Sequence, residues 1–457
     1  MKALLRALVT GKPADYVEAR FEESQTTRIV YRGAQLETVT EATLSGGAIR
    51  ALVRGGWGFA SFNRPQEAED MVKAALAGAE RVGRERQERV ALAPIEIVEA
   101  ELPLTPEEDP RRLSLAQKVE LMGEYNRRIM AWGPPVTSSQ VVYQEKFSRL
   151  WLATSEGTYV YQERLDLSGL IAAVATRNGE TQIGRFGFGS SRDFGVARDL
   201  EAKAEQACRL AADLLVAPVV QAGEYPVVCD PRLAGVFVHE AFGHLSEADD
   251  LAENPALREV MRLGRRFGQP ILNIYDSGLD RGARGYVPYD DEGTPGQKSP
   301  LIQEGVLVGR LHSRESAARL GEKPTGNARA LDFRFPPICR MRNTRIEAGT
   351  AAFEDLLQGI DTGVYAVDSY GGETNGEMFT FTAGYGRMIR QGKLAELVRE
   401  VKLTGNVFHT LENIEAIGRE VDTGDAPGGC GKGAQSPLPV SHWSPAIRIR
   451  RAVVGGK

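Results

Sequence analysis

The chain has 457 residues, of which 42% are hydrophobic and 26% are charged, and this balance excludes an intrinsically disordered protein. Its 56 Lys and Arg residues stand against 61 Asp and Glu residues, so the formal net charge is −5 and the surface has no general attraction for nucleic acid or anionic lipid. Four scattered cysteines without a CxxC pair are too few for a disulfide scaffold and indicate a reducing compartment.

The apolar runs of the sequence are short. Arg6 interrupts the first run, residues 1–9, which is too short for a signal sequence and lacks a good cleavage site. The longest later run, residues 167–175, is far below the ~20 residues that a membrane span needs. We therefore expect a cytoplasmic protein that has no membrane partner and no direct contact with nucleic acid.

Two strand-then-helix patterns recur in the first half of the chain. Residues 16–63 alternate in the manner of β-strands, and residues 66–82 then follow a helical period. The same order returns in residues 141–189 and 195–215. The recurrence predicts either a diverged internal duplication or two unrelated α+β units.

The segment between these patterns reads as an acidic, proline-bearing linker over residues 94–110, followed by a helix over 113–132. A domain boundary is expected near residues 217–223. Beyond it the sequence is rich in glycine and in strand patterns, and short helices are predicted at 231–242, 255–263 and 351–358. The predicted fold class is α+β, with an α+β N-terminal domain at residues 1–219 and a mostly β C-terminal domain at 220–457.

Five histidines occur in the chain, and two of them, His239 and His244, lie in the stretch VHEAFGHLSE. From the composition, a His-acid-x-x-x-His pattern arises by chance with a probability below about one percent. Asp230 is suited to be an N-cap and Pro231 to be the first helical residue, so the motif is predicted to lie on a helix.

The spacing of the two histidines is five residues, not the four of the commoner HExxH. Residues five apart lie about 140° apart on an ideal α-helix, so the two rings can share one ion only if the helix widens between them. A π-type turn has this geometry, and Gly243 permits it. Glu240 would then point towards a water molecule that zinc has acidified, and its carboxylate would accept the proton as the water attacks a carbonyl. The alternative is a helix with two surface histidines.

These residues resemble a known family. VHEAFGHLSEAD is similar to the HExxxH segment of the TldD/PmbA family of zinc-dependent peptidases, specifically its TldD type. The further segments that resemble the family, in the same order, are YDDEGTP (289–295), PTGNARA (324–330), MRNTRIEAG (341–349) and GGCGKGAQS (428–436), together with RGGWGFASFN (54–63).

The resemblance implies a two-domain α+β protein that holds Zn²⁺ at the HExxxH segment and a C-terminal cysteine, and that hydrolyses unfolded or leader-type peptides. It also implies a homodimer, or a heterodimer with a TldE/PmbA-type paralogue, with the site in a cavity at the dimer interface. Cys430 fits the cysteine role, since four glycines surround it and Lys432 would favour its thiolate. The predicted ligands are therefore His239, His244 and Cys430, with Glu240 catalytic.

Several alternatives stay open. Glu247 is a competing third ligand, or it orients a histidine. The acidic stretch 289–293 is expected to form a turn, and His312, His409 and His442 are expected to have structural roles. Besides the peptidase, the chain could be a non-catalytic peptide-binding or partner subunit with a structural zinc. A third class is a cysteine hydrolase that uses Cys430 with His409 or His442 as base.

Overall fold

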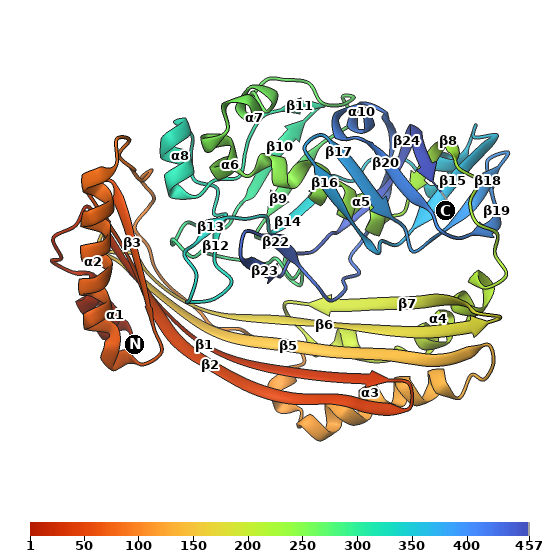
Figure 1. Ribbon diagram of the computed structural model, residues 1–457, viewed down its shortest axis with the longest axis horizontal. Helices are drawn as coiled ribbons and strands as arrows, with labels where there is room; N and C mark the ends of the chain where they lie inside the picture. Colours follow the sequence, from red (N-terminus) through yellow and green to blue (C-terminus); the bar gives the residue numbers. More distant parts are fainter. Residues whose placement is uncertain (456–457) are drawn as a thin grey trace.

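The computed structural model describes residues 1–455, and the first half of the chain forms one long, curved sheet of seven strands (Figure 1). The strand order is β3-β2-β1-β5-β6-β4, and β7 also pairs with β6. These strands are β1 (Tyr16–Arg32), β2 (Gln35–Val53), β3 (Gly56–Phe62), β4 (Glu99–Leu102), β5 (Val136–Thr154), β6 (Tyr159–Arg177) and β7 (Glu180–Ser190).

The two faces of this sheet have different partners. Alternate side chains of a strand point to opposite faces, and in β6 Leu165 and Leu167 pack in the same core as the helices, whereas Arg164 and Asp166 contact the second half of the chain. The helices on the first face are α1 (Lys2–Val9), α2 (Ala68–Glu85), α3 (Leu115–Met130) and α4 (Glu201–Leu214). In Figure 1 the second half of the chain lies over the opposite face.

The predicted recurrence corresponds to two similar units in this sheet. Strands β1 to β3 are followed by α2, and strands β5 to β7 are followed by α4. A common origin of the two units stays a prediction. The segment 94–110, which the sequence marks as a linker, also contributes a strand, because β4 pairs in parallel with β6.

The second half of the chain is built around a nine-stranded sheet of order β16-β17-β20-β24-β8-β15-β18-β19, with β21 beside β24. Its strands are β8 (Gly223–Cys229), β15 (Thr362–Val367), β16 (Gly371–Asn375), β17 (Met378–Thr382), β18 (Tyr385–Arg390), β19 (Lys393–Val398), β20 (Lys402–Asn406), β21 (Ile414–Asp422) and β24 (Ser444–Gly455). Smaller sheets consist of β9 (Ile274–Ser277), β10 (Lys298–Gln303), β11 (Val306–Leu307) and β14 (Asn343–Ile346), of β12 (Ala328–Arg329) and β13 (Ile338–Cys339), and of β22 (Cys430–Lys432) and β23 (Gln435–Leu438).

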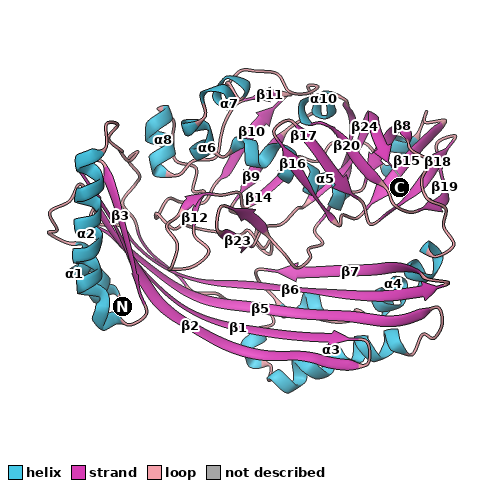
Figure 2. Cartoon of the chain, viewed as in Figure 1, coloured by secondary structure: helices cyan, strands magenta, loops and turns pink. Residues whose placement is uncertain are grey.

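Only short helices interrupt these sheets (Figure 2). They are α5 (Pro231–Val238), α6 (Ala248–Glu253), α7 (Pro255–Val260), α8 (Arg314–Leu320), α9 (Phe353–Leu357) and α10 (Val407–Glu412). The predicted α+β class, with a strand-dominated second half, is confirmed. None of the helices within residues 1–455 is long and apolar enough to cross a membrane.

The acidic turn at residues 289–295 joins the two halves. Asp291 accepts a hydrogen bond from Arg164 of β6 at 3.1 Å, and Glu292 accepts one from Arg50 of β2 at 2.6 Å. A third ion pair, between Arg284 and Asp166 at 2.6 Å, lies further along β6. Hydrogen bonds hold charge pairs of this kind in a fixed geometry. The three pairs therefore fix the second half of the chain against the sheet.

Candidate metal centre and active site

The HExxxH segment lies on a helix that widens between its two histidines. The Asp230 side chain caps α5 by accepting a hydrogen bond from the backbone N–H of Leu233 at 2.8 Å, and Pro231 begins the helix. A π-helical turn, η4 (His239–Gly243), continues α5, and a 3₁₀ turn, η5 (His244–Ser246), follows. The π-type turn predicted from the five-residue spacing is therefore present.

Two glycines allow this segment to pack closely. Gly243 has φ −59°, an ordinary helical value, so its backbone conformation does not require glycine. A Cβ atom at Gly243 would lie 2.0 Å from the Met341 sulfur, and one at Gly235 would lie 2.0 Å from the carbonyl oxygen of His442. Close approach, not backbone flexibility, therefore explains the glycine in the motif.

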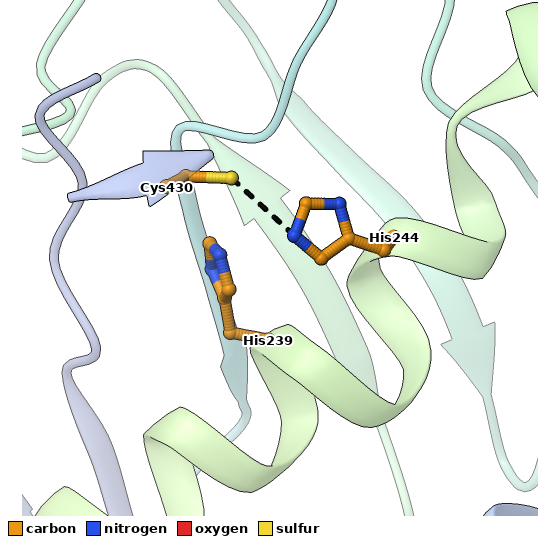
Figure 3. A group of neighbouring side chains, drawn as sticks. All are labelled: His239, His244 and Cys430. Carbon is orange, nitrogen blue, oxygen red and sulfur yellow. Dashed lines mark hydrogen bonds between the residues drawn. The ribbon is translucent and has the colours of Figure 1, made fainter. Parts of the chain in front are cut away.

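His239, His244 and Cys430 come together although 186 residues separate the last two (Figure 3). One ligand atom of each lies within 4.8 Å of the others. The sulfur of Cys430, at the start of β22, is 3.4 Å from Nε2 of His244. Arg340, which is fully buried, donates to the carbonyl oxygen of Cys430 at 2.7 Å and so holds the cysteine backbone in place.

The environment of His239 suits a metal ligand. Its ring is buried, and neither nitrogen has a hydrogen-bond partner within the described part of the chain. An imidazole nitrogen buried without a partner is costly unless something coordinates it. Two imidazoles and a thiolate form a donor set that zinc prefers, and three protein ligands leave a fourth position open. The residues present therefore fit a zinc ion.

The ionisation of Cys430 also suits this role. Burial opposes formation of its thiolate, but His239 and His244 outweigh this effect and lower the pKa of Cys430 to about 5. Burial disfavours the charged ring of His244, yet Cys430 and Glu247 raise its pKa to about 10. These shifts favour a thiolate beside a protonated imidazole at neutral pH. A metal ion would have to displace the proton of that imidazole, which couples metal binding to proton release.

Glu247 lies on the other side of the His244 ring from Cys430. A carboxylate oxygen of Glu247 is 3.0 Å from Nδ1 of His244. The residue is fully buried, and although burial opposes its ionisation, the bond from His244 and the charge of Lys432 lower its pKa. Glu247 thus holds the ring of His244 in place. Glu247 itself does not belong to the group of three side chains whose ligand atoms lie within 4.8 Å of one another.

Lys432 forms ion pairs with three carboxylates beside the site. Its ammonium group lies 2.6 Å from Asp249, 3.1 Å from Asp250 and 3.3 Å from Glu247. The charge of Lys432 lowers the pKa of Glu247, which contacts His244. The two histidines, in turn, lower the pKa of the Cys430 thiol. The expectation that Lys432 favours the thiolate stays a prediction.

Glu240 lines a cavity beside the ligand group. Its side chain is 30% exposed, and a carboxylate oxygen lies 3.8 Å from Nε2 of His244. The cavity has a volume of about 300 Å³ and lies between β7 and the second half of the chain, with walls from Arg185, Arg232 and the loop 424–429. The cavity wall thus presents a carboxylate that lies 3.8 Å from a ligand nitrogen.

The three remaining histidines differ. His312 is buried and bonds to Ser316 and Glu322, and His409 is exposed on α10, so both fit structural roles. His442 lies in the wall of the cavity that Glu240 lines, and its ring stands perpendicular to that of His239 with centroids 4.8 Å apart. Burial and the neighbouring positive charges hold the pKa of His442 well below its usual value. The sequence carries no spacing signal for this position.

Comparison with known proteins identifies the family. Three family models match in chain order: PmbA/TldA metallopeptidase domain 1 at residues 17–79, the central domain at 108–215 and the C-terminal domain at 222–456. A metalloprotease of Synechocystis is 48% identical over 445 residues, which cover 97% of this chain and 95% of the relative. A zinc metalloprotease TldD homolog of Saccharolobus solfataricus is 39% identical over 238 residues, 52% of each chain.

The fold is also shared with a solved structure. TldE from Thermococcus kodakarensis superposes with a TM-score of 0.80 at 18% identity, and the match covers 100% of both chains. The sequence relatives, the family models over most of the chain and the HExxxH geometry agree. The chain belongs to the TldD/PmbA family and is a metallopeptidase.

Proposed function

We propose that this metallopeptidase is zinc-dependent, that it hydrolyses unfolded or leader-type peptides, and that Glu240 is its general base. The observation that carries the proposal is the group of His239, His244 and Cys430 beside a cavity lined by Glu240. A structural zinc is usually closed by four protein ligands. The open position therefore favours the peptidase over a non-catalytic subunit with a structural zinc.

The roles of the residues follow from their chemistry. A zinc ion bound by the three side chains would acidify a water molecule and polarise a peptide carbonyl. Two neutral imidazoles and one thiolate would leave that site with a net charge of +1. Glu240, on the cavity side, accepts the proton of the attacking water and returns it to the leaving nitrogen. Glu247 keeps the His244 ring in the orientation that aims Nε2 at the metal position.

The preference for unfolded peptides is supported by the sheet edge beside the cavity. Within residues 1–455, strand β16 is the end strand of the nine-stranded sheet, and β17 is its one neighbour there. Its first residue, Gly371, lines the cavity together with Ser369 and Tyr370. An extended peptide that adds to such an edge is held by main-chain hydrogen bonds and with little side-chain selectivity. Folded proteins cannot present their backbone in this way.

The partner that we propose is a second copy of this chain or a TldE/PmbA-type paralogue. The TldE structure has the same fold over its full length, so a paralogue can present matching surfaces. The net charge of −5 agrees with the absence of direct nucleic-acid contact. We place the protein in the cytoplasm because its four cysteines are free.

Removal and return of the metal test this function. The purified protein is assayed on an unstructured fluorogenic peptide of mixed sequence and on a folded protein of similar composition, and its zinc content is measured in parallel. We expect the peptide alone to be cut, a chelator to abolish cleavage, and stoichiometric zinc to restore it. Cleavage that persists in fully metal-free protein would refute the proposal and would favour the cysteine-hydrolase alternative.

A further inference from the structure

The ring of His442 is the feature of the cavity that the proposed mechanism leaves unused. It lies between β23 and β24, in the same wall as Glu240. Its centroid is 4.8 Å from that of His239, at an interplanar angle of 89°. Burial and the positive charges of its neighbours keep the pKa of this ring well below its usual value. An imidazole carries at least one N–H in either protonation state, so the ring can offer a hydrogen-bond donor in the cavity wall.

The backbone on both sides of His442 is held firmly. The Ser441 hydroxyl accepts from the backbone N–H of Arg284 at 2.7 Å and donates to Asp425 at 2.7 Å. The indole N–H of Trp443 donates to the same carboxylate at 3.2 Å. The carbonyl oxygen of His442 also packs against Gly235 of α5, where a Cβ atom would be 2.0 Å away. The backbone that carries the ring is therefore fixed, and a donor on a fixed backbone has less to reorganise during a reaction.

The other cationic side chains of the cavity wall already have partners. Arg185 donates to Asp368 at 2.8 Å, Arg232 donates to the carbonyl oxygen of Asp425 at 2.9 Å, and Arg284 pairs with Asp166. His442 is also outside the group whose ligand atoms lie within 4.8 Å of one another. His442 thus lies beside His239 and in the wall of the cavity. A hydrogen-bond donor to a bound substrate would need this position.

We propose that His442 is an additional catalytic residue, which donates a hydrogen bond to the oxygen of the scissile carbonyl as that oxygen becomes negative. The inference rests on the proposed peptidase function. The water oxygen bonds to the carbonyl carbon while its proton passes to Glu240, and the C=O π electrons move to the carbonyl oxygen, where His442 stabilises them. When the C–N bond breaks, those electrons re-form the C=O bond and the nitrogen takes the proton from Glu240.

Three variants test this role. His442→Leu removes the donor at similar volume, His442→Gln keeps an N–H donor, and His409→Leu is the matched control at the exposed histidine. Each is assayed for bound zinc, for kcat and KM on the unstructured peptide, and for inhibition by a phosphinic peptide, whose tetrahedral group imitates the charged intermediate. Wild-type and Glu240→Gln protein are measured beside them.

For His442→Leu we expect full zinc content, a kcat lowered by about 10²-fold and a KM nearly unchanged, because loss of one oxyanion donor has an effect of this size. The phosphinic peptide should bind more weakly by a similar factor. His442→Gln should recover part of both losses, and His409→Leu should match the wild type. If the leucine variant does not fold, His442→Ala takes its place, and added imidazole should restore turnover.

An unchanged kcat in His442→Leu would overturn the proposal. Loss of zinc in proportion to activity would overturn it too, because His442 would then be a metal ligand. If binding of the phosphinic peptide and of the substrate weakened equally, His442 would be only a substrate contact. That result would also overturn the proposal. Failure of the proposed function looks different, since the wild type would then not cut the peptide or Glu240→Gln would cut it normally.

Discussion

A carboxylate oxygen of Glu247 lies 3.0 Å from Nδ1 of His244. An ionised carboxylate can only accept hydrogen bonds, so Nδ1 carries the proton and Nε2 is left to face the metal position and Cys430. Glu247→Gln should therefore weaken zinc binding by about 10- to 100-fold while zinc can still saturate the protein. Competition for zinc with a chromogenic chelator measures this, with the exposed Glu253→Gln as control. An unchanged affinity would mean that the ring is oriented by packing alone.

Replacement of Cys430 should affect the metal more than replacement of any other cysteine. A serine hydroxyl is a much weaker zinc ligand than a thiolate. We therefore expect the zinc affinity of Cys430→Ser to be lower than that of Glu247→Gln by roughly tenfold or more. Cys208→Ser and Cys229→Ser are the controls, because both thiols are buried and burial raises the pKa of each. Zinc content after dialysis is the readout. Retention of zinc in Cys430→Ser with its loss in Glu247→Gln would assign the ligand role to the carboxylate.

Gly243→Ala should disturb the π-type turn through packing. The added methyl group would lie 2.0 Å from the Met341 sulfur, and overpacking of this kind costs about 1–3 kcal/mol. The double variant Gly243→Ala/Met341→Ala should bind zinc better than Gly243→Ala, because the clash is removed. Thermal unfolding and zinc titration of both variants check this. Equal zinc affinities in the two variants would point to the backbone, not to Met341, as the reason for the glycine.

The cap of α5 makes stability depend on pH. Burial raises the pKa of Asp230 from its ordinary 3.8 to about 7 in the folded protein. A raised folded-state pKa means that the folded protein binds this proton more tightly than the unfolded chain does. The stabilisation of the fold by this proton is complete below about pH 3.8 and is lost as the pH rises towards about 7. Asp230→Asn keeps an N-cap acceptor and removes the titration.

Relative to the wild type, Asp230→Asn should therefore be more stable near neutral pH than in mild acid. The measurement is the difference in Tm between variant and wild type on both sides of this window. Asp361→Asn, at an exposed carboxylate, should show the same difference at both pH values. Parallel behaviour of Asp230→Asn and Asp361→Asn would show that Asp230 titrates at its ordinary pKa in the folded protein.

The sequence predicts those parts of the site that depend on local spacing. The five-residue interval between His239 and His244 requires a wider turn, and that turn is present. The approach of Cys430 is predicted from its glycine-rich surroundings and the family resemblance, and the structure brings it to the two histidines. His442 could not be predicted in the same way, because its place depends on how the chain before β24 packs against Gly235. The pairing of β4 with β6 is likewise a tertiary contact that overrides a loop-like sequence.

The most direct test of the general-base role of Glu240 is the effect of Glu240→Gln on peptide cleavage by zinc-loaded protein. Glutamine keeps the shape of the side chain and leaves His239, His244 and Cys430 in place, but it cannot accept the proton of the attacking water. We expect zinc content equal to that of the wild type and a kcat lower by about 10²- to 10⁴-fold. If zinc-loaded Glu240→Gln protein cleaved the unstructured peptide at the wild-type rate, Glu240 would not be the general base.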